Sequence, residues 1–282
     1  DRSPSRGLGD VYKRQGMVML SQFIESVYED NTGNMWSENQ LLELVKDWED
    51  PNPDPVIINY EGIDVVRDDL LNYGSKIRFV DKFIQETTAK EIVFGCCPAT
   101  GYAQISLPVV AEKYDKKVVL FMAKRNPENY HEYQKRGMDL GAIYEWVNMG
   151  MLSVTKSRAK KYVAEDPENR MEFPIGLEHP TVVASIIKVA RNALSKNPPS
   201  EIWSVGSSGT ISRGLQLAFP EIPVNVVSVG HKMNEREIGR AKYYRSEYQF
   251  DKAIKENEMP PFPSAPTSVS YTHLRAHETD SY

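Results

Sequence analysis

The chain has 282 residues, of which 40% are hydrophobic and 26% are charged, so it is long enough for two ordinary globular domains. Its formal net charge of -5, from 34 basic and 39 acidic residues, argues against a general affinity for nucleic acid or anionic lipid. No apolar run in the sequence approaches the roughly 20 residues that span a bilayer, so we do not expect the chain to be an integral membrane protein.

The two cysteines, Cys96 and Cys97, are adjacent in the sequence. The peptide between neighbouring cysteines resists disulfide geometry, so we do not expect a secreted disulfide scaffold, and a reducing cytoplasm is the simplest setting. With only two cysteines and five scattered histidines, we do not expect a zinc site either.

The two ends, residues 1–15 and 268–282, lack the periodicity of a helix or a strand. They resemble translated sequencing-adapter sequence at the ends of assembled metagenomic reads, and we treat both as artefactual tails. The alternative is a pair of natural disordered tails. If the tails are artefacts, we expect this sequence to be truncated near Thr267 relative to the natural chain.

The first predicted helix begins after Ser37, which forms a capping box with Gln40, and runs to about Trp48. Pro51 and the prolines after it end this helix. A β-hairpin with a Glu-Gly turn follows, with predicted strands at residues 56–60 and 63–66.

Strands and helices alternate through the rest of the chain. The predicted helices cover residues 77–86, 103–114, 126–140, 157–165, 181–194, 211–219 and 234–257. The predicted strands cover residues 92–94, 118–122, 143–147, 173–175, 202–205 and 224–229. This order predicts an α/β protein with parallel sheets and helices on both faces, and so many strands favour two lobes.

The clearest candidate binding segment is the loop at residues 206–210, Gly-Ser-Ser-Gly-Thr, between a predicted strand and a predicted helix. Its glycines let the backbone turn sharply and approach a ligand closely. Backbone N–H groups at the start of a helix bind anions, and three hydroxyl side chains add donors. The pattern favours a phosphate site over an ordinary strand-to-helix turn.

A second segment places Lys76 in the first turn of a predicted helix, after Gly74 and Ser75. The positive end of the helix dipole lowers the pKa of a lysine there, so Lys76 is a candidate nucleophile. Taken alone, the segment favours a solvated lysine instead.

The third segment covers residues 94–104 and carries Cys96, Cys97, Thr100, Gly101 and Tyr102. A strand delivers small residues to the start of a helix here, which makes a possible ligand-facing turn. For the two cysteines, the pattern favours packing over reactive thiols.

Together the three segments resemble fold-type II pyridoxal-phosphate enzymes, above all the branch of 1-aminocyclopropane-1-carboxylate deaminase and D-cysteine desulfhydrase. In that family an Arg-Asp-Asp-Leu stretch precedes Gly-Asn-Lys-x-Arg, whose lysine carries the cofactor. Here residues 67–70 read Arg-Asp-Asp-Leu, and residues 74–78 read Gly-Ser-Lys-Ile-Arg. Residues 206–210 match the family's phosphate-binding Gly-Ser-Gly-Gly-Thr loop in place and order. The resemblance covers about residues 63–229.

The resemblance implies a two-lobed fold-type II protein, with a large lobe of residues 16–81 and 176–267 and a small lobe of residues 82–175. It implies a lyase or deaminase that uses pyridoxal 5'-phosphate on a small amino acid, and a possible homodimer. The residues it assigns are Lys76 as the catalytic residue, Gly206, Ser207, Ser208, Gly209, Thr210 and Tyr102 for the cofactor, and Thr100 and Gly101 for the substrate. Arg78 is either structural or neutralises Asp68 and Asp69.

The sequence also departs from the family. The family has Ser-Asn at the turn where this chain has Thr100, Gly101 and Tyr102, so either Tyr102 replaces the asparagine or the lobe accepts another ligand. The family's partner for the pyridine nitrogen is expected beyond Thr267. Two alternatives therefore stay open: a transferase that grips a phosphorylated nucleotide or sugar, and a binding module without catalysis.

Overall fold

A computed structural model of the chain describes residues 27–148, 150–230, 232–246 and 255–263. The tails expected at residues 1–15 and 268–282, and the truncation expected near Thr267, lie outside these residues. Within the described ranges, no helix has the length and apolar character needed to cross a membrane.

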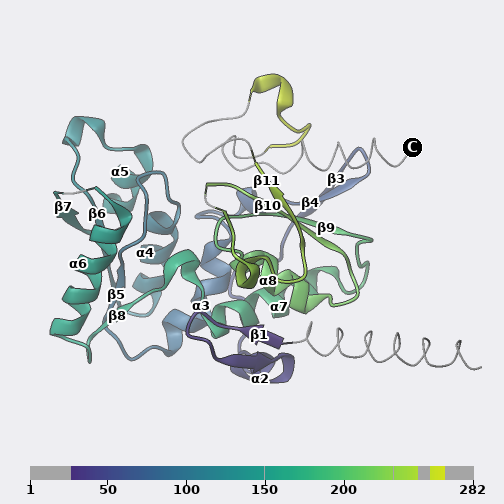
Figure 1. Cartoon of the computed structure of the whole chain (residues 1–282), viewed down its shortest axis with the longest axis horizontal. Coiled ribbons are helices and arrows are strands. Elements are labelled where there is room, and N and C mark those ends of the chain that lie inside the picture. The colour runs from purple at the N-terminus through teal and green to yellow at the C-terminus, as the bar shows by residue number, and fades with distance from the viewer. Residues whose placement is uncertain (1–26, 149, 231, 247–254, 264–282) are drawn as a thin grey trace, which may run out of the picture.

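The first sheet lies on the left of Figure 1 and has four parallel strands. Their spatial order is β7 (Ile143–Val147), β6 (Lys117–Ala123), β5 (Glu91–Phe94) and β8 (Arg170–Glu172). The helix α6 (Leu152–Glu165) covers one face, where Ala159 packs on Val93 and Val119. The other face packs against α4 (Ala103–Lys113), beside α5 (Glu132–Asp139), so helices cover both faces as the alternating pattern predicted (Figure 1).

The second sheet has three parallel strands in the order β11 (Lys242–Arg245), β10 (Val224–Ser228) and β9 (Ile202–Gly206). The helix α8 (Thr210–Ala218) connects β9 to β10 and packs on both strands. Every side chain of β10 is buried, as expected for the central strand of a parallel sheet.

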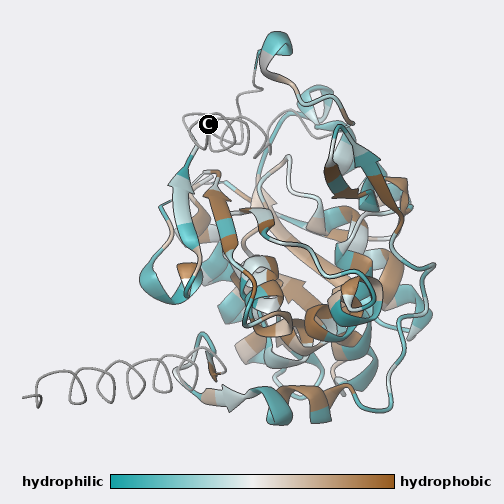
Figure 2. Ribbon diagram, turned by 90° about the vertical axis from the view of Figure 1, so that its right-hand side faces the viewer, coloured by the Kyte–Doolittle hydropathy of each residue, from teal (hydrophilic) through white to brown (hydrophobic). Residues whose placement is uncertain are grey.

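Three helices join the two sheets into one hydrophobic core. These are α3 (Lys76–Glu86), α7 (Pro180–Leu194) and α8, with α7 in contact with both of the others. Figure 2 shows hydrophobic segments gathered in the middle of the molecule and hydrophilic ones along its outer helices and turns. This core holds the start of α3 and the start of α8 in fixed positions.

Two antiparallel pairs complete the fold. The predicted hairpin is confirmed as β3 (Ile57–Tyr60) and β4 (Ile63–Val66), and β1 (Val27–Glu29) pairs with β2 (Met35–Ser37). The capping box is also confirmed: the Ser37 side chain accepts from the Gln40 N–H, and Gln40 accepts from the Ser37 N–H. The helix it starts, α2 (Glu38–Leu44), ends earlier than the predicted Trp48, which lies buried beyond it.

The predicted helix at residues 234–257 is wrong. The structure has the four-residue α9 (Glu235–Ile238), ended by Gly239 at a φ of 63°, and then β11; residues 247–254 are not described. Tyr243 and Tyr244 favour a strand, and pairing with β10 satisfies their backbone groups, so the tertiary context overrides a polar helical pattern.

Two smaller predictions also need correction. The strand expected at residues 173–175 is instead β8, three residues earlier, followed by the 3-10 turn η3 (Ile175–Leu177). The helix expected at residues 126–140 is split into η2 (Pro127–Asn129) and α5, because His131 makes its own capping box with Gln134 and starts a new helix. The other 3-10 turns are η1 (Asp68–Leu70) and η4 (Glu256–Glu258).

Candidate active site

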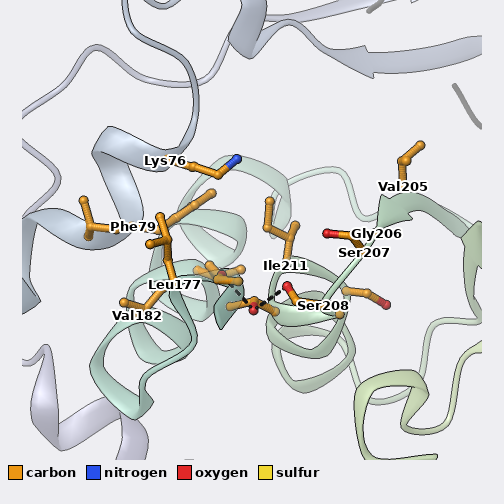
Figure 3. A pocket seen from close by; sticks show the side chains of 15 residues that line it. Lys76, Phe79, Leu177, Val182, Val205, Gly206, Ser207, Ser208 and Ile211 are labelled. Atoms are coloured by element: carbon orange, nitrogen blue, oxygen red, sulfur yellow. Dashed lines mark hydrogen bonds between the residues drawn. The ribbon is translucent and has the colours of Figure 1, made fainter. Parts of the chain in front are cut away.

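A cavity of about 200 Å³ lies where α3, α7 and α8 meet, and it brings together two of the three candidate segments. Lys76 enters it from the start of α3, and the 206–210 loop forms the opposite wall (Figure 3). The remaining wall is mostly apolar and consists of Phe79, Val80, Gly176, Leu177, Val182, Ile186, Val205, Ile211 and Ser212. In sequence the two polar walls are far apart, and the shared core of α3, α7 and α8 places them face to face.

The shape of the 206–210 loop depends on Gly209, which lies in the left-handed region at a φ of 76° as the N-cap of α8. A Cβ atom at Gly209 would lie 2.2 Å from the Glu237 carbonyl oxygen and 2.9 Å from Met233 Cε. Only glycine fits both the backbone angle and the space. The loop therefore turns tightly, and its five residues line the cavity.

Several hydrogen-bond donors of the 206–210 loop, which lines the cavity, have no protein partner among the described residues. Among the described residues, no protein acceptor binds the backbone N–H groups of Ser207, Ser208, Gly209 or Thr210. The Ser207 hydroxyl likewise has no protein partner in this part of the chain, whereas Thr210 donates to the Gly176 carbonyl at 3.1 Å and lies 3.1 Å from Ser208 Oγ. Free N–H groups at the positive end of α8 make an anion site.

The backbone before Lys76 is held in an unusual conformation. Tyr73 and Gly74 both have a positive φ, of 73° and 75°, and a non-glycine residue rarely adopts this conformation. The Ser106 hydroxyl donates to the Tyr73 carbonyl at 2.8 Å, and a Cβ atom at Gly74 would lie 2.9 Å from the Tyr102 ring. Contacts from α4 thus fix the turn from which Lys76 projects.

The Lys76 amino group has no acidic partner among the described residues. Burial lowers the pKa of Lys76, and the nearby Cys97 opposes this shift only in part. Figure 3 shows the amino group pointing into the space above Ile211, toward the side of the 206–210 loop. A lysine with a lowered pKa presents more of the neutral amine, the form that attacks a carbonyl carbon.

The acidic turn before Lys76 is neutralised by two arginines. Arg78, which is 2% exposed, binds Asp50 at 2.7 Å and Asp68 at 3.2 Å. Asp69 instead pairs with Arg67 at 2.7 Å. Arg78 is therefore both structural and the counter-charge of Asp68, and it anchors the first turn of α3.

The third candidate segment does not line the cavity. Thr100 is exposed, Gly101 packs against Cys97, and the Tyr102 ring packs on Gly74 and edge-on against Tyr133. Both cysteines are free and buried, as the preference for packing predicted, and burial raises the pKa of the Cys97 thiol to about 12. Neither is a ready thiolate nucleophile.

The sequence did not reveal the wall at Gly176 and Leu177. Both residues have a positive φ, of 69° and 55°, and a Cβ atom at Gly176 would lie 2.2 Å from Ser208 Oγ. The glycine after Pro174 and Ile175 was the available signal, but the pattern of this stretch favoured a strand.

Comparison with known proteins finds similar folds among solved structures but no match by sequence. No family model matches the chain, and no curated protein matches it by sequence. Among solved structures, the chain is similar to an ACC deaminase homologue, with a TM-score of 0.69 and 14% identity over 86% of this chain and 90% of the other. It is also similar to threonine deaminase isoform 2 from Solanum lycopersicum, with a TM-score of 0.58 and 12% identity over 74% of this chain and 61% of the other.

A third similar structure is serine racemase from Dictyostelium discoideum, with a TM-score of 0.54 and 14% identity over 68% of this chain and 65% of that one. The chain thus has the α/β fold of fold-type II pyridoxal-phosphate enzymes, which confirms the fold that the sequence resemblance implied. At these identities the likeness establishes the fold, and the site residues carry the argument about function.

Proposed function

We propose that the protein is a pyridoxal-phosphate-dependent lyase or deaminase that acts on a small amino acid, as the names of the similar structures suggest. The observation that carries the proposal is the single cavity shared by Lys76 and the 206–210 loop. A reactive amine on one wall and an anion site on the other suit a ligand that has an aldehyde and a phosphate.

The residues of the cavity fit this cofactor in charge and polarity. The free N–H groups of the 206–210 loop and the Ser207 hydroxyl would hold the phosphate. Lys76, whose pKa is lowered by burial, would meet the aldehyde carbon. Phe79, Leu177 and Ile211 offer an apolar surface for a flat ring between the two walls.

Lys76 has two tasks in the proposed reaction. As a neutral amine it would hold the cofactor at its aldehyde, and with substrate bound it would hold or move a proton at the α or β carbon of the amino acid. When bound, pyridoxal phosphate supplies the electron sink for the negative charge at that carbon. The apolar walls limit water around the amine, which keeps its pKa low.

The proposal also keeps four predictions made from the sequence. Thr100 and Gly101 as substrate contacts and Tyr102 as a cofactor contact stay predictions, because all three lie outside the cavity, and the substrate complex would have to bring them to it. A homodimer and a cytoplasmic location also belong to the proposal; the two free cysteines support the second.

Substitution of Lys76 tests the proposal. Lys76→Ala should abolish the visible absorbance that pyridoxal phosphate gains on reaction with the protein, while weak phosphate-dependent binding survives. Lys76→Arg should fail equally, because a guanidinium stays protonated. Lys82→Ala, on the same helix and paired with Glu86, is the matched control and should keep the absorbance. Full absorbance in Lys76→Ala would contradict the role of Lys76.

One observation favours a second candidate function. The turn at residues 100–102 carries no amide side chain and does not line the cavity. The cavity therefore lacks a contact from this turn that would select pyridoxal phosphate over another phosphorylated ligand. A transferase for a phosphorylated nucleotide or sugar, or a binding module without catalysis, would bind phosphate compounds at the 206–210 loop. Neither would form a bond with Lys76, which separates both from the first proposal.

A further inference from the structure

The 206–210 loop lies between two turns from distant parts of the chain. On one side is Gly176, whose carbonyl accepts from Thr210 and whose missing side chain makes room for Ser208. On the other side is the α9 turn, where the Glu237 carbonyl lies so close to Gly209 that no side chain fits between them. The position of the loop therefore depends on the distance between these two turns.

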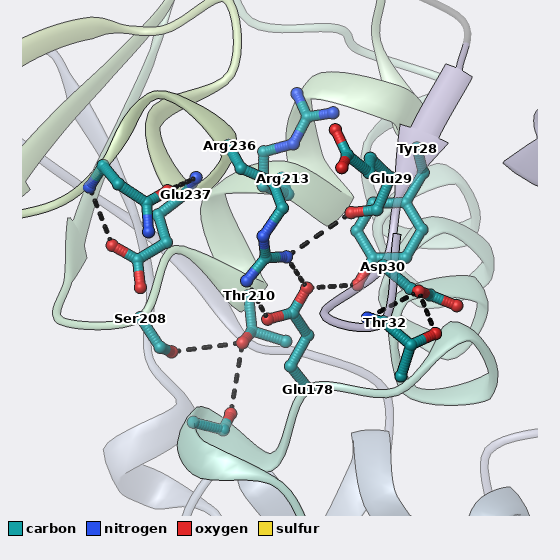
Figure 4. Close-up of polar contacts among 12 residues, drawn as sticks. Tyr28, Glu29, Asp30, Thr32, Glu178, Ser208, Thr210, Arg213, Arg236 and Glu237 are labelled. Atoms are coloured by element: carbon teal, nitrogen blue, oxygen red, sulfur yellow. Dashed lines mark hydrogen bonds and ion pairs between the residues drawn. The ribbon is translucent and has the colours of Figure 1, made fainter. Parts of the chain in front are cut away.

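One ion pair ties the two turns together. Glu178 follows Gly176 by two residues and Arg236 precedes Glu237 by one. Arg236 donates to both oxygens of the Glu178 carboxylate, at 2.5 Å to Oε1 and 3.1 Å to Oε2. Figure 4 shows this pair beside Thr210, with Ser208 and Thr210 in the same view. Since both terminal nitrogens of Arg236 bind Glu178, the arginine acts on the loop through the turn that carries it.

The buried environment of Glu178 fixes the geometry of its ion pair with Arg236. Glu178 is 5% exposed, so its carboxylate needs partners, and the Tyr28 hydroxyl supplies a further hydrogen bond at 2.5 Å to Oε1. Tyr28 is itself buried in β1, and Arg236 also reaches the Glu29 carbonyl at 3.4 Å. A bidentate pair with one buried partner fixes angle as well as distance.

The α9 turn is held on one side by α8, where Gln216 donates to the Ile238 carbonyl at 2.9 Å and Ile238 packs against the core. None of its four residues is buried, and its capping box between Asn234 and Glu237 is internal to the turn. Among the described contacts, the bond from Arg236 to Glu178 ties this turn directly to the segment that follows Gly176.

We propose that Arg236 and Glu178 are positioning residues for phosphate binding: their ion pair clamps the α9 turn against the Gly176 turn and so aims the N–H groups of the 206–210 loop at the cavity. The inference rests on the proposed function for the phosphate group of the ligand. It adds residues that neither touch the ligand nor belong to the motif that first indicated the site.

The test compares ligands with and without phosphate. Affinity for pyridoxal phosphate and for inorganic phosphate is measured by calorimetry, and reaction of Lys76 with phosphate-free pyridoxal is followed by borohydride trapping. Arg236→Gln and Glu178→Gln should each lower the affinity for both phosphate ligands by about tenfold. The rate at which Lys76 reacts with pyridoxal should stay within about twofold of wild type. Arg236→Lys, which keeps the charge without the bidentate geometry, should lie in between.

Two further variants complete the design. The double variant should bind phosphate no more weakly than the weaker single variant, because the two residues act as one unit. Arg170→Gln is the matched control: it removes a half-buried ion pair with Glu91 in the other sheet, at 2.9 Å, and should leave phosphate binding unchanged.

Each result bears on the inference. Unchanged phosphate affinity in Arg236→Gln, or an equal loss toward pyridoxal and phosphate ligands, would overturn it, the latter because it indicates a general structural role. A wild type whose phosphate affinity depends on this ion pair but that forms no bond at Lys76 would refute the proposed function and support the clamp. A wild type that binds no phosphate ligand would overturn both.

Discussion

At the scale of single residues, Gly209 is a position that only glycine can occupy. Its φ is positive, and a Cβ atom would collide with the Glu237 carbonyl. Gly141 provides a comparison, because its φ of 87° is equally unsuited to a side chain but nothing lies within 4 Å of the Cβ position. Comparing Gly209 with Gly141 separates the free-energy cost of the backbone angle from that of the steric clash.

We therefore expect different outcomes from two glycine-to-alanine substitutions. Gly141→Ala should cost about 1 kcal/mol of stability from the backbone angle alone and leave phosphate binding intact. Gly209→Ala should cost more and should abolish binding of pyridoxal phosphate, because the 206–210 loop must move away from α9. Urea denaturation and calorimetry measure the two effects; equal behaviour of both variants would contradict the close approach.

His179 is a residue at which pH should affect stability. It caps α7 by accepting the Thr181 N–H on Nδ1 and packs on Phe83, and burial lowers its pKa to about 4 from an ordinary value of 6.5. The unfolded chain thus takes up a proton on His179 below about pH 6.5, while the folded protein stays neutral there down to about pH 4.

Stability from His179 should accordingly be complete above pH 6.5 and decline as the pH falls toward 4, by at most about 1.4 kcal/mol per pH unit. His179→Asn keeps a capping acceptor without a titrating group, so the variant should lose this part of the pH dependence. Urea denaturation of both proteins at pH 7 and pH 5 measures the difference. Parallel declines in the two proteins would assign the pH dependence to other groups.

At the scale of elements, the start of α3 depends on Arg78. Arg78 lies two residues after Lys76, and its guanidinium joins Asp50 and the Pro53 carbonyl to the acidic turn at Asp68. Burial raises the pKa of Asp68, and Arg78 limits that rise. The arginine therefore favours the charged form of a partly buried carboxylate and holds the helix start that carries the lysine.

Arg78→Met should leave Asp68 and Asp50 without their counter-charge and cost about 3–5 kcal/mol, the range for breaking a buried ion pair. Arg78→Lys should cost less, because one charge is kept while the fork of donors is lost. The change in the urea midpoint of unfolding provides the measurement. A loss below about 1 kcal/mol in Arg78→Met would show that α3 is held mainly by its apolar face.

The elements that the sequence predicted are those whose signals are local. The capping box at Ser37 and Gln40, the hairpin at Glu61-Gly62 and the buried strand at residues 92–94 all depend on neighbouring residues, and the structure confirms them. The helix expected at residues 234–257 failed because β11 exists through pairing with β10, a partner that no local pattern of charged residues reveals.

At the scale of the whole molecule, the sequence brought out the two polar walls of the cavity as motifs, Lys76 and the 206–210 loop. The third wall, at Gly176 and Leu177, comes from a turn without a recognisable pattern, and its role depends on contact with Ser208 and Thr210. The ion pair of Glu178 and Arg236 joins residues 58 positions apart and carries no signal in a single sequence. Long-range contacts of this kind become visible only in the folded chain.

The central claim is that one cavity joins a reactive lysine to a phosphate site. Its most direct test is borohydride reduction of the protein with pyridoxal phosphate, followed by peptide mass spectrometry. We predict a single modified lysine, Lys76, and loss of that modification when inorganic phosphate competes for the 206–210 loop. Modification spread over exposed lysines with Lys76 unmodified would contradict the account.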